Sequence, residues 1–309
     1  MNQEILKELI RIGELLENIG RSLKKIAVYL NDENKNCSFD NDLELSKIKL
    51  DENVELNDAI SLLKDEIIDY LEKNKFTITL IPEENTSKFL VNISKYIGEK
   101  YDYVKDFLKQ IKTSLNTGLP VKMYMEKMGQ EKISYICQLA SNLHEGAFLE
   151  NYRYFNSPKF LLTAQPLRKP LVINFINGGW LENYIVYKIE TILSACGLKK
   201  GKDFDYLKNI KLKLPNGNDF ELDVLFKIKD KIFWFEAKTG DYQQYVHKYS
   251  EVSKLLKIPS EQAFMVITEI SNVVAEAIST LFNMTVCNLT TFETSLKNTL
   301  KKLNLVEQE

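Results

Sequence analysis

Histidine, cysteine and long apolar runs are scarce in this 309-residue chain. It has two histidines, His144 and His247, which argues against a histidine-rich zinc site and against a histidine-based catalytic triad. The four cysteines lie far apart, without metal-ligand spacing, a pattern typical of reduced thiols in a cytoplasmic protein. No run of about 20 apolar residues is present, and the N-terminus lacks the apolar core of a signal peptide. We therefore expect no membrane association.

The chain also lacks an excess of one charge sign. It contains 41 lysines and arginines and 43 aspartates and glutamates, which gives a net charge of −2. This balance gives the chain no global basic field of the kind that attracts nucleic acid. An enzyme of this composition that acts on nucleic acid would need a local basic groove or metal ions. The length is sufficient for two domains, each with its own core.

The N-terminal region carries a regular apolar pattern from Leu9 to Leu30, with alternating steps of three and four residues over about three heptads. This pattern predicts a coiled-coil helix within residues 1–30 and homo-oligomers formed through it. An amphipathic helix that packs on its own domain is the alternative. Residues 31–56 are rich in Asn, Asp, Glu and Lys and are interpreted as a polar linker.

Residues 57–170 are interpreted as a mainly helical regulatory or oligomerisation domain. The expected elements are helices at Asn57–Lys73, Lys88–Leu115 and Lys132–Leu149 and a short strand at Phe76–Ile81. Aromatic and basic residues then alternate in Tyr152, Arg153, Tyr154 and Phe155, before Arg168 and Lys169. Such a mixture can clamp single-stranded nucleic acid, although an ordinary connector between domains is the favoured interpretation.

Residues 171–309 alternate strand and helix patterns and are interpreted as an α/β domain with a mixed central sheet flanked by helices. Asn216-Gly217 is a strong hairpin signal. The expected strands are Leu171–Ile176 (or an extended entry), Lys208–Leu214, a hairpin from Phe220 to Lys238, Ala263–Thr268 and Thr285–Leu289, and the expected helices are Trp180–Leu193, Asp241–Lys257, Asn272–Phe282 and Thr291–Leu303.

The hairpin from Phe220 to Lys238 places acidic side chains on one face of an otherwise apolar ribbon. Side chains two apart in a strand share a face, so Glu236 and Lys238 point the same way. A loop made of Asp230 and Lys231 sets Asp223 opposite Lys238, and a loop displaced by one residue sets it opposite Glu236. Either register brings the three side chains together, with opposed Cβ atoms roughly 5 Å apart.

Two carboxylates and an ammonium group are costly to bury unless they bind something. Hard carboxylate oxygens suit Mg²⁺ or Mn²⁺, which proteins hold through one or two carboxylates, waters and substrate phosphate oxygens. Lys238 would orient the attacking water and offset charge in the transition state. Asp223, Glu236 and Lys238 therefore indicate phosphodiester hydrolysis.

Asp223 is followed, after twelve intervening residues, by Glu236-Ala237-Lys238. This spacing of acidic and basic residues resembles the PD-(D/E)XK motif of restriction-endonuclease-like nucleases. Leu222 stands where the motif usually has proline. The resemblance implies a metal site formed by Asp223, Glu236 and the Ala237 carbonyl. In that superfamily a glutamate of the first core helix often joins the site, and Glu182 occupies that place.

Polar residues on the helix after the motif contact the scissile strand in related folds. Gln243 and Gln244 would do so here, with Lys248 on the same helix as a further substrate-binding residue. A solvated helix face is the alternative interpretation of these three residues.

The chain contains the segments Gly178-Gly179-Trp180-Leu181-Glu182, Asp223-Val224-Leu225-Phe226 and Glu236-Ala237-Lys238-Thr239-Gly240. These three segments together are similar to the nuclease domain of CRISPR ancillary nucleases that bear a CARF sensor domain. The similarity covers roughly the last 135 residues, within the size of one domain, and leaves the N-terminal half unassigned. It implies a Mg²⁺- or Mn²⁺-dependent endonuclease in antiviral defence or restriction, with DNA preferred to RNA as substrate. The alternatives are a catalytically silent nucleic-acid-binding or scaffold protein, and an RNA nuclease that needs an activating ligand or partner protein.

Overall fold

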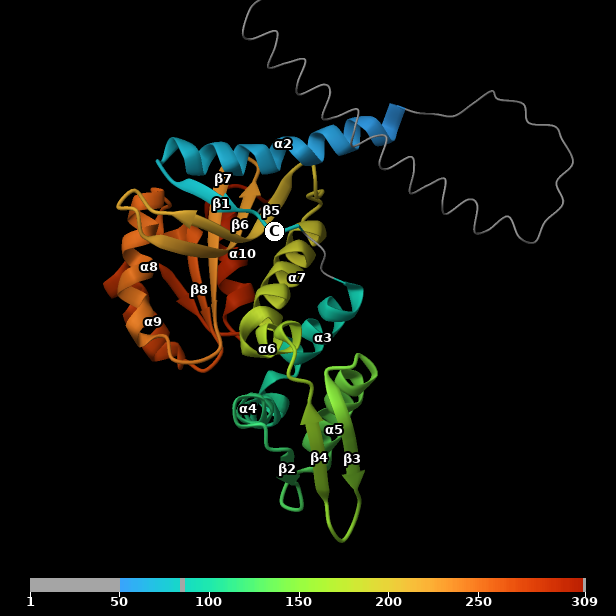
Figure 1. Ribbon diagram of the computed structural model, residues 1–309. Helices are drawn as coiled ribbons and strands as arrows, with labels where there is room; N and C mark the ends of the chain where they lie inside the picture. Colours follow the sequence, from blue (N-terminus) through green and yellow to red (C-terminus); the bar gives the residue numbers. More distant parts are fainter. Residues whose placement is uncertain (1–50, 84–86, 308–309) are drawn as a thin grey trace, which may run out of the picture. The chain divides into compact units, whose positions relative to one another are not determined.

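The computed structural model describes residues 51–83 and 87–307, with side chains described from residue 62 onward (Figure 1). The coiled-coil helix expected within residues 1–30 lies outside this range, as does most of the polar linker. Residues 51–56 of that linker belong to the first described helix, α2 (Asp51–Lys73).

A six-stranded sheet forms the centre of the described chain (Figure 1). Its strand order is β1-β5-β6-β7-β8-β9, with antiparallel pairing from β1 to β7 and parallel pairing from β7 through β8 to β9. The sheet is therefore mixed, as predicted. The strands are β1 (Thr77–Leu80), β5 (Phe204–Lys213), β6 (Asp219–Ile228), β7 (Lys231–Lys238), β8 (Ala263–Ile267) and β9 (Thr285–Cys287).

Helices cover both faces of this sheet, because alternate side chains of its strands are apolar on each side. Phe233, Phe235 and Phe264 belong to the core on the face of α7 and α10, whereas Trp234 and Met265 belong to the core on the face of α2, α8 and α9. The helices are α7 (Trp180–Ala195), α8 (Gln243–Leu256), α9 (Asn272–Phe282) and α10 (Phe292–Lys302), with a 3₁₀ turn at Ser260–Gln262.

A second, three-stranded antiparallel sheet has the order β2-β4-β3. Its buried side chains belong to the same core cluster as those of α3, α4 and α5. The α3 helix begins at a Ser87 side chain that accepts from the Leu90 N–H at 3.3 Å, and α4 ends at Gly118, whose φ of 78° suits glycine. The elements are α3 (Lys88–Glu99), α4 (Tyr101–Thr117), β2 (Val121–Tyr124), α5 (Gln130–Glu145), β3 (Leu149–Phe155) and β4 (Leu161–Pro166).

Three segments differ from the sequence-based expectation. Leu171–Ile176 is not a strand: Pro170 opens the short helix α6 (Pro170–Asn174), and a π-helical turn, Phe175–Gly179, leads into α7. The expected helix Lys88–Leu115 is two helices that meet at Lys100. The expected helix Lys132–Leu149 ends at Glu145, and Leu149 opens β3, so Tyr152–Phe155 is a paired strand rather than a connector.

The proposed division between residues 57–170 and 171–309 is crossed by paired and packed elements. Strand β1 pairs with β5, with Thr77 opposite Lys213, and helix α2 packs on β5 and β6. Helix α3 packs against α7. Within the described ranges, none of the helices combines the length and apolar character that crossing a bilayer requires.

Candidate active site

Asp223 and Glu236 lie where β6 and β7 separate. The two strands pair from Ile228 opposite Lys231 as far as Val224 opposite Phe235, and the same register sets Asp223 opposite Glu236. The loop is Lys229-Asp230, with Lys229 in the left-handed region at φ 52°. The displaced register is therefore the one adopted.

Beyond this fork, β6 is paired with β5, and β7 continues alongside β8, with Lys238 opposite Ile267. The two strands separate at these carboxylates while each stays paired with its other neighbour in the sheet.

The Glu236 carboxylate is fully buried, with 0% of the residue exposed, and both of its oxygens have donors. Oε1 accepts from the Trp234 indole N–H at 3.0 Å and from the Asp223 main-chain N–H at 3.3 Å. Oε2 accepts from the Lys238 ammonium at 3.1 Å. The two oxygens thus face different surroundings, one held by the scaffold and one by a charged group.

Lys238 bridges the two carboxylates, with its Nζ 3.5 Å from Asp223 Oδ2 and 3.1 Å from Glu236 Oε2. Asp223 Oδ2 also accepts from the Ala237 main-chain N–H at 2.8 Å. Helix α8 covers the ammonium from the other side, because Nζ lies 4.8 Å from the centre of the Tyr249 ring. Such a cation over an aromatic face is favourable, so the ammonium is held from both sides.

Burial and mutual charge shift the protonation of these groups. Burial raises the pKa of Glu236 well above its ordinary value, and the neighbouring Asp223 raises it further. Burial alone lowers the pKa of Lys238, but Glu236 and Asp223 outweigh it and leave that pKa above its usual range. The ammonium is therefore charged at neutral pH, and an added cation would favour the ionised form of Glu236.

Glu182 on α7 lies close enough to Asp223 for their charges to interact. Burial, with Asp223 as the next cause, raises the pKa of Glu182 to about 7. Its side chain lines a cavity of about 670 Å³ together with the glycines of the π-helical turn and with Lys208, Lys211 and Glu221 of β5 and β6. Asp223, Glu236 and Lys238 do not line this cavity, so the place of Glu182 in the site stays a prediction.

The donor set fits a hard divalent cation, because it offers two converging carboxylates on a fixed strand pair, and Mg²⁺ is commonly held by one or two carboxylates with waters. No group of three or more Asp, Glu, His or Cys residues within 51–83 and 87–307 is arranged as a metal site. Glu182 therefore does not join Asp223 and Glu236 in a preformed three-carboxylate cluster. Its role as a ligand, and that of the Ala237 carbonyl, remain predictions.

The expected substrate-binding residues all lie on α8. Gln243 and Gln244 are exposed in its first turn. Lys248 lies one turn after Gln244 on the same face of the helix, with Nζ 4.8 Å from the centre of the Phe220 ring, and lines a hollow with the Asn216 turn. Their contact with a substrate stays a prediction.

Sequence reasoning missed Lys112, which reaches the end of β7 from α4. Its Nζ donates to Thr239 Oγ1 at 2.9 Å and to the Asn177 carbonyl at 3.3 Å. Thr239 also donates to Asn177, so the π-helical turn, the residue after Lys238 and α4 are joined. No sequence signal pairs residues so far apart, whereas Trp234 was detectable as the residue two before Glu236 on the same strand face.

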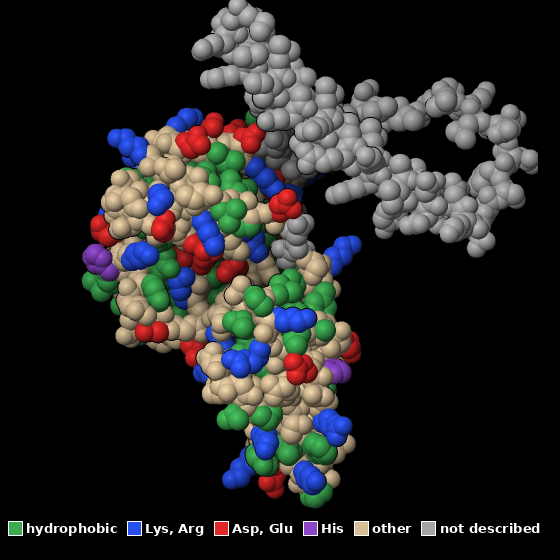
Figure 2. Space-filling model, viewed as in Figure 1, with side chains coloured by type: hydrophobic (Ala, Val, Ile, Leu, Met, Phe, Trp, Pro, Cys, Tyr) green, Lys and Arg blue, Asp and Glu red, His purple; other side chains and the backbone are tan. Residues whose placement is uncertain are grey.

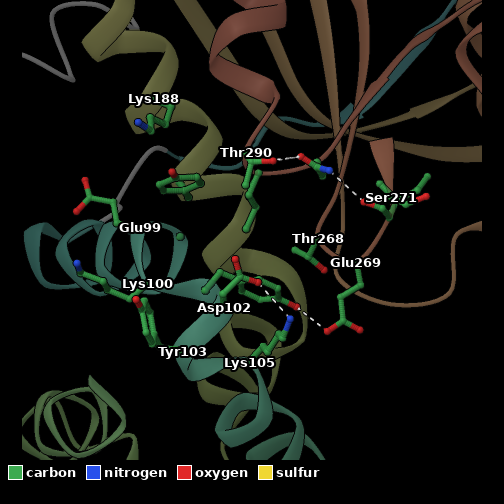
Figure 3. Close-up of a pocket in the computed structure, with 16 residues that line it drawn as sticks. Glu99, Lys100, Asp102, Tyr103, Lys105, Lys188, Thr268, Glu269, Ser271 and Thr290 are labelled. Atoms are coloured by element: carbon green, nitrogen blue, oxygen red, sulfur yellow. Dashed lines mark hydrogen bonds and ion pairs between the residues drawn. The ribbon is translucent and has the colours of Figure 1, made fainter. Parts of the chain in front are cut away.

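A second cavity, of about 600 Å³, lies between the start of α4 and the segments after β8 and β9 (Figure 3). Several of its charged groups are paired with one another or with neighbours. Lys105 lies 3.1 Å from Asp102, and Glu269 lies 2.8 Å from Lys109. We assign this cavity no role in the candidate active site.

Comparisons with known proteins support the fold. No protein-family model and no curated protein matches this chain. Among solved structures, protein VC1899 from Vibrio cholerae matches at a TM-score of 0.51 and 16% identity, over 77% of this chain and 61% of that protein. Can2 from Sulfobacillus thermosulfidooxidans, solved in complex with cyclic tetra-adenylate, matches at a TM-score of 0.50 and 15% identity, over 74% of this chain and 59% of Can2.

This chain thus spans about three fifths of either protein. Most of its described structure is shared with VC1899 and Can2, and at these identities the likeness concerns the fold.

Proposed function

We propose that this chain is a metal-dependent nuclease that hydrolyses phosphodiester bonds at Asp223, Glu236 and Lys238. The observation that carries the proposal is the convergence of these three side chains at the β6–β7 fork, within 3.1–3.5 Å of one another through the Lys238 ammonium. The end of the β6–β7 pairing at these residues and the charge interaction between Glu182 and Asp223 support the proposal.

The residues have distinct tasks in this proposal. Asp223 and Glu236 Oε2 would hold Mg²⁺ or Mn²⁺, with Glu182 and the Ala237 carbonyl as further ligands. The ion, when bound, neutralises phosphate charge and lowers the pKa of a bound water. Lys238, kept protonated by the two carboxylates, would donate a hydrogen bond to the attacking water or to a phosphate oxygen. Trp234 and the Asp223 N–H hold Oε1 of Glu236, so we assign the cation to Oε2, whose donor is the Lys238 ammonium.

We propose DNA as the preferred substrate and an antiviral defence role in the cytoplasm. The motif resemblance to nuclease domains of CARF-bearing CRISPR ancillary nucleases supports the setting, and the fold shared with Can2 agrees with it. Can2 was solved with cyclic tetra-adenylate. Activation of this chain by a small ligand or by a partner protein is therefore part of the proposal. The oligomerisation role of residues 1–30 belongs to the same proposal.

The proposal is tested by incubating the protein with supercoiled plasmid, linear duplex DNA, single-stranded DNA and single-stranded RNA. Each substrate is incubated with Mn²⁺, with Mg²⁺ and with EDTA, in the presence and absence of cyclic oligoadenylates. We expect cleavage that needs the metal, with DNA cut faster than RNA. Cleavage that persists in EDTA would contradict the metal-dependent mechanism, and intact substrates under every condition would contradict the nuclease assignment.

A further inference from the structure

The three-stranded sheet has one face packed on helices and one face open. Along β2, Val121 and Met123 are buried, whereas Lys122 and Tyr124 between them are exposed. The inner face continues across the sheet, since Met123 pairs with Leu162 and Leu162 pairs with Tyr154. Side chains alternate between faces, so Lys122 and Tyr124 point away from α4 and α5.

The outer face carries a row of aromatic and apolar residues across all three strands. Tyr124 pairs with Leu161, and Leu161 pairs with Phe155. Tyr124 is 71% exposed and Phe155 is 38% exposed. Strands are spaced about 4.8 Å apart, so the two rings stand roughly 10 Å apart on either side of Leu161.

A basic row lies directly beside the aromatic row. Lys122 pairs with Thr163, and Thr163 pairs with Arg153, two residues further along each strand. The rise of about 3.4 Å per residue places this row roughly 7 Å from the first. In the loop at the tip, Lys159 Nζ lies 5.5 Å from the centre of the Phe155 ring.

Acidic side chains are sparse on this surface. Glu150 is the one acidic residue in the three strands, and it lies at the end of β3 away from Phe155. Glu126 follows β2 in a loop that also holds Lys127. Figure 2 shows mainly basic and hydrophobic side chains where these strands meet their loops. In a chain whose net charge is −2, this is a local basic surface.

Helix α5, on the opposite side of the sheet, lacks that character. Lys132 is its sole lysine or arginine, and it is paired with Asp106 at 2.7 Å. Glu131 and Glu145 are also on this helix, and Glu131 is exposed. A polyanion would therefore be drawn to the open sheet face rather than to α5.

We propose that the open face of the β2-β4-β3 sheet is a binding platform for single-stranded nucleic acid, separate from the candidate active site. Tyr124 and Phe155 stack on bases, and Lys122 and Arg153 contact phosphates one row away. Exposed aromatic rings beside basic residues are the combination that binds unpaired strands with little sequence preference. Duplex DNA hides its base faces and offers nothing for the rings to stack on.

Of the aromatic and basic residues at Tyr152–Phe155, only Arg153 and Phe155 lie on the open face. Tyr152 and Tyr154 lie on the inner face, and the Tyr152 hydroxyl donates to the Cys137 carbonyl of α5 at 3.3 Å. The exposed ring that replaces them, Tyr124, comes from a strand about 30 residues away, which only the pairing reveals.

The test is fluorescence anisotropy of the full chain with labelled 15-nucleotide oligo(dT) and oligo(U), in EDTA so that no cleavage interferes. We expect the Tyr124→Ala/Phe155→Ala variant to weaken binding at least 10-fold, and Tyr124→Phe to retain it. Lys122→Ala/Arg153→Ala should reduce the slope of log K against log salt by about 0.7 for each charge removed. Leu281→Ala and Lys297→Ala, exposed on α9 and α10, are the matched controls.

Three results would overturn the proposal: no binding by the unmodified chain, equal binding by the aromatic double variant, or tighter binding to a matched 15-base-pair duplex. Because all substituted side chains are exposed, circular dichroism melting should show unchanged folding, which separates lost binding from lost structure. Binding in EDTA is independent of cleavage, so this proposal and the nuclease proposal can fail separately.

Discussion

Asp223 and Glu236 hold each other in place through main-chain N–H groups. The Asp223 N–H donates to Glu236 Oε1 at 3.3 Å, and the N–H of Ala237, the residue after Glu236, donates to Asp223 Oδ2 at 2.8 Å. This reciprocal bonding fixes both carboxylates at the fork before any ligand arrives. Preorganised groups of this kind avoid reorganisation during a reaction.

Trp234→Phe should impair the site by removing the indole N–H that donates to the buried Glu236. The carboxylate then lacks one donor, which costs about 1–3 kcal/mol of the free energy of unfolding for a buried polar group. We also expect weaker Mn²⁺ binding, because Oε1 is no longer held. Urea unfolding and Mn²⁺ titration calorimetry measure the two effects.

The matched control for this substitution is Trp180→Phe, which removes the same volume from a tryptophan that is similarly buried but lies on α7. It should lose stability through packing while leaving the affinity for Mn²⁺ unchanged. An equal loss of Mn²⁺ affinity in both variants would mean that Trp234 acts through packing alone.

Much of the C-terminal domain was predictable because its signals are local. The helix at Asn272–Phe282 has the expected bounds, with Ser271 as N-cap, and Asn216-Gly217 forms the expected turn. The register of Asp223 stayed open because Lys229, Asp230 and Lys231 are all polar. The positive φ of Lys229 decides it, and no sequence rule favours lysine there.

What could not be predicted depends on contacts between distant segments. The apolar run Leu171–Ile176 has strand composition, but Pro170 and the packing of Phe175 and Ile176 in the core give it helical geometry. The pairing of β1 with β5 joins residues that are more than 100 positions apart in the sequence. The hydrogen bond from Lys112 to Thr239 joins residues that are 127 positions apart. Periodicity within one segment carries no information about either.

Glu182→Gln should make the metal-free protein less sensitive to pH. The folded-state pKa of Glu182, about 7, is above its value of about 4.3 in the unfolded chain, so folding favours the protonated form. The stability that this preference contributes is complete below about pH 4 and is lost as the pH rises through 7. Glutamine mimics the protonated form, so the variant should be more stable than the unmodified protein at pH 8.

The measurement is thermal melting in EDTA at pH 5, 6, 7 and 8, with Glu221→Gln as the control from the same cavity. A Glu182→Gln curve parallel to that of the unmodified protein across this range would contradict the raised pKa. If Glu182 also binds the metal, addition of Mn²⁺ at pH 8 should stabilise the unmodified protein more than the variant.

Lys112→Met should reduce cleavage about 10-fold while leaving the core intact. Burial lowers the pKa of Lys112, yet its ammonium joins α4 to Thr239, directly after Lys238, and to the π-helical turn that precedes Glu182. Methionine keeps the length of the side chain and removes the donors. Single-turnover cleavage rates, compared with Lys109→Met on the exposed side of α4, measure the effect. Equal cleavage rates for Lys112→Met and the unmodified protein would show that Lys112 has no role in cleavage beyond its structural contacts.

Asp223→Asn should weaken Mn²⁺ binding and slow cleavage by at least 100-fold. The substitution keeps the shape of the side chain, but it removes a negative charge from the pair that Lys238 bridges and gives the ion a neutral ligand. Asp219→Asn, an exposed acid at the start of the same strand, is the matched control. Calorimetric titration with Mn²⁺ gives the affinity, and retention of wild-type affinity by Asp223→Asn would remove Asp223 from the metal site.

The most direct test of the central claim compares cleavage by the unmodified chain, Glu236→Gln and Lys238→Ala, in Mn²⁺ and on whichever substrate the unmodified chain cuts. The proposed mechanism requires both the carboxylate and the ammonium. Each variant should therefore lose at least a thousandfold in rate while circular dichroism still shows a folded protein. Metal-dependent cleavage at an undiminished rate by both folded variants would show that the Asp223, Glu236 and Lys238 cluster is not the catalytic centre.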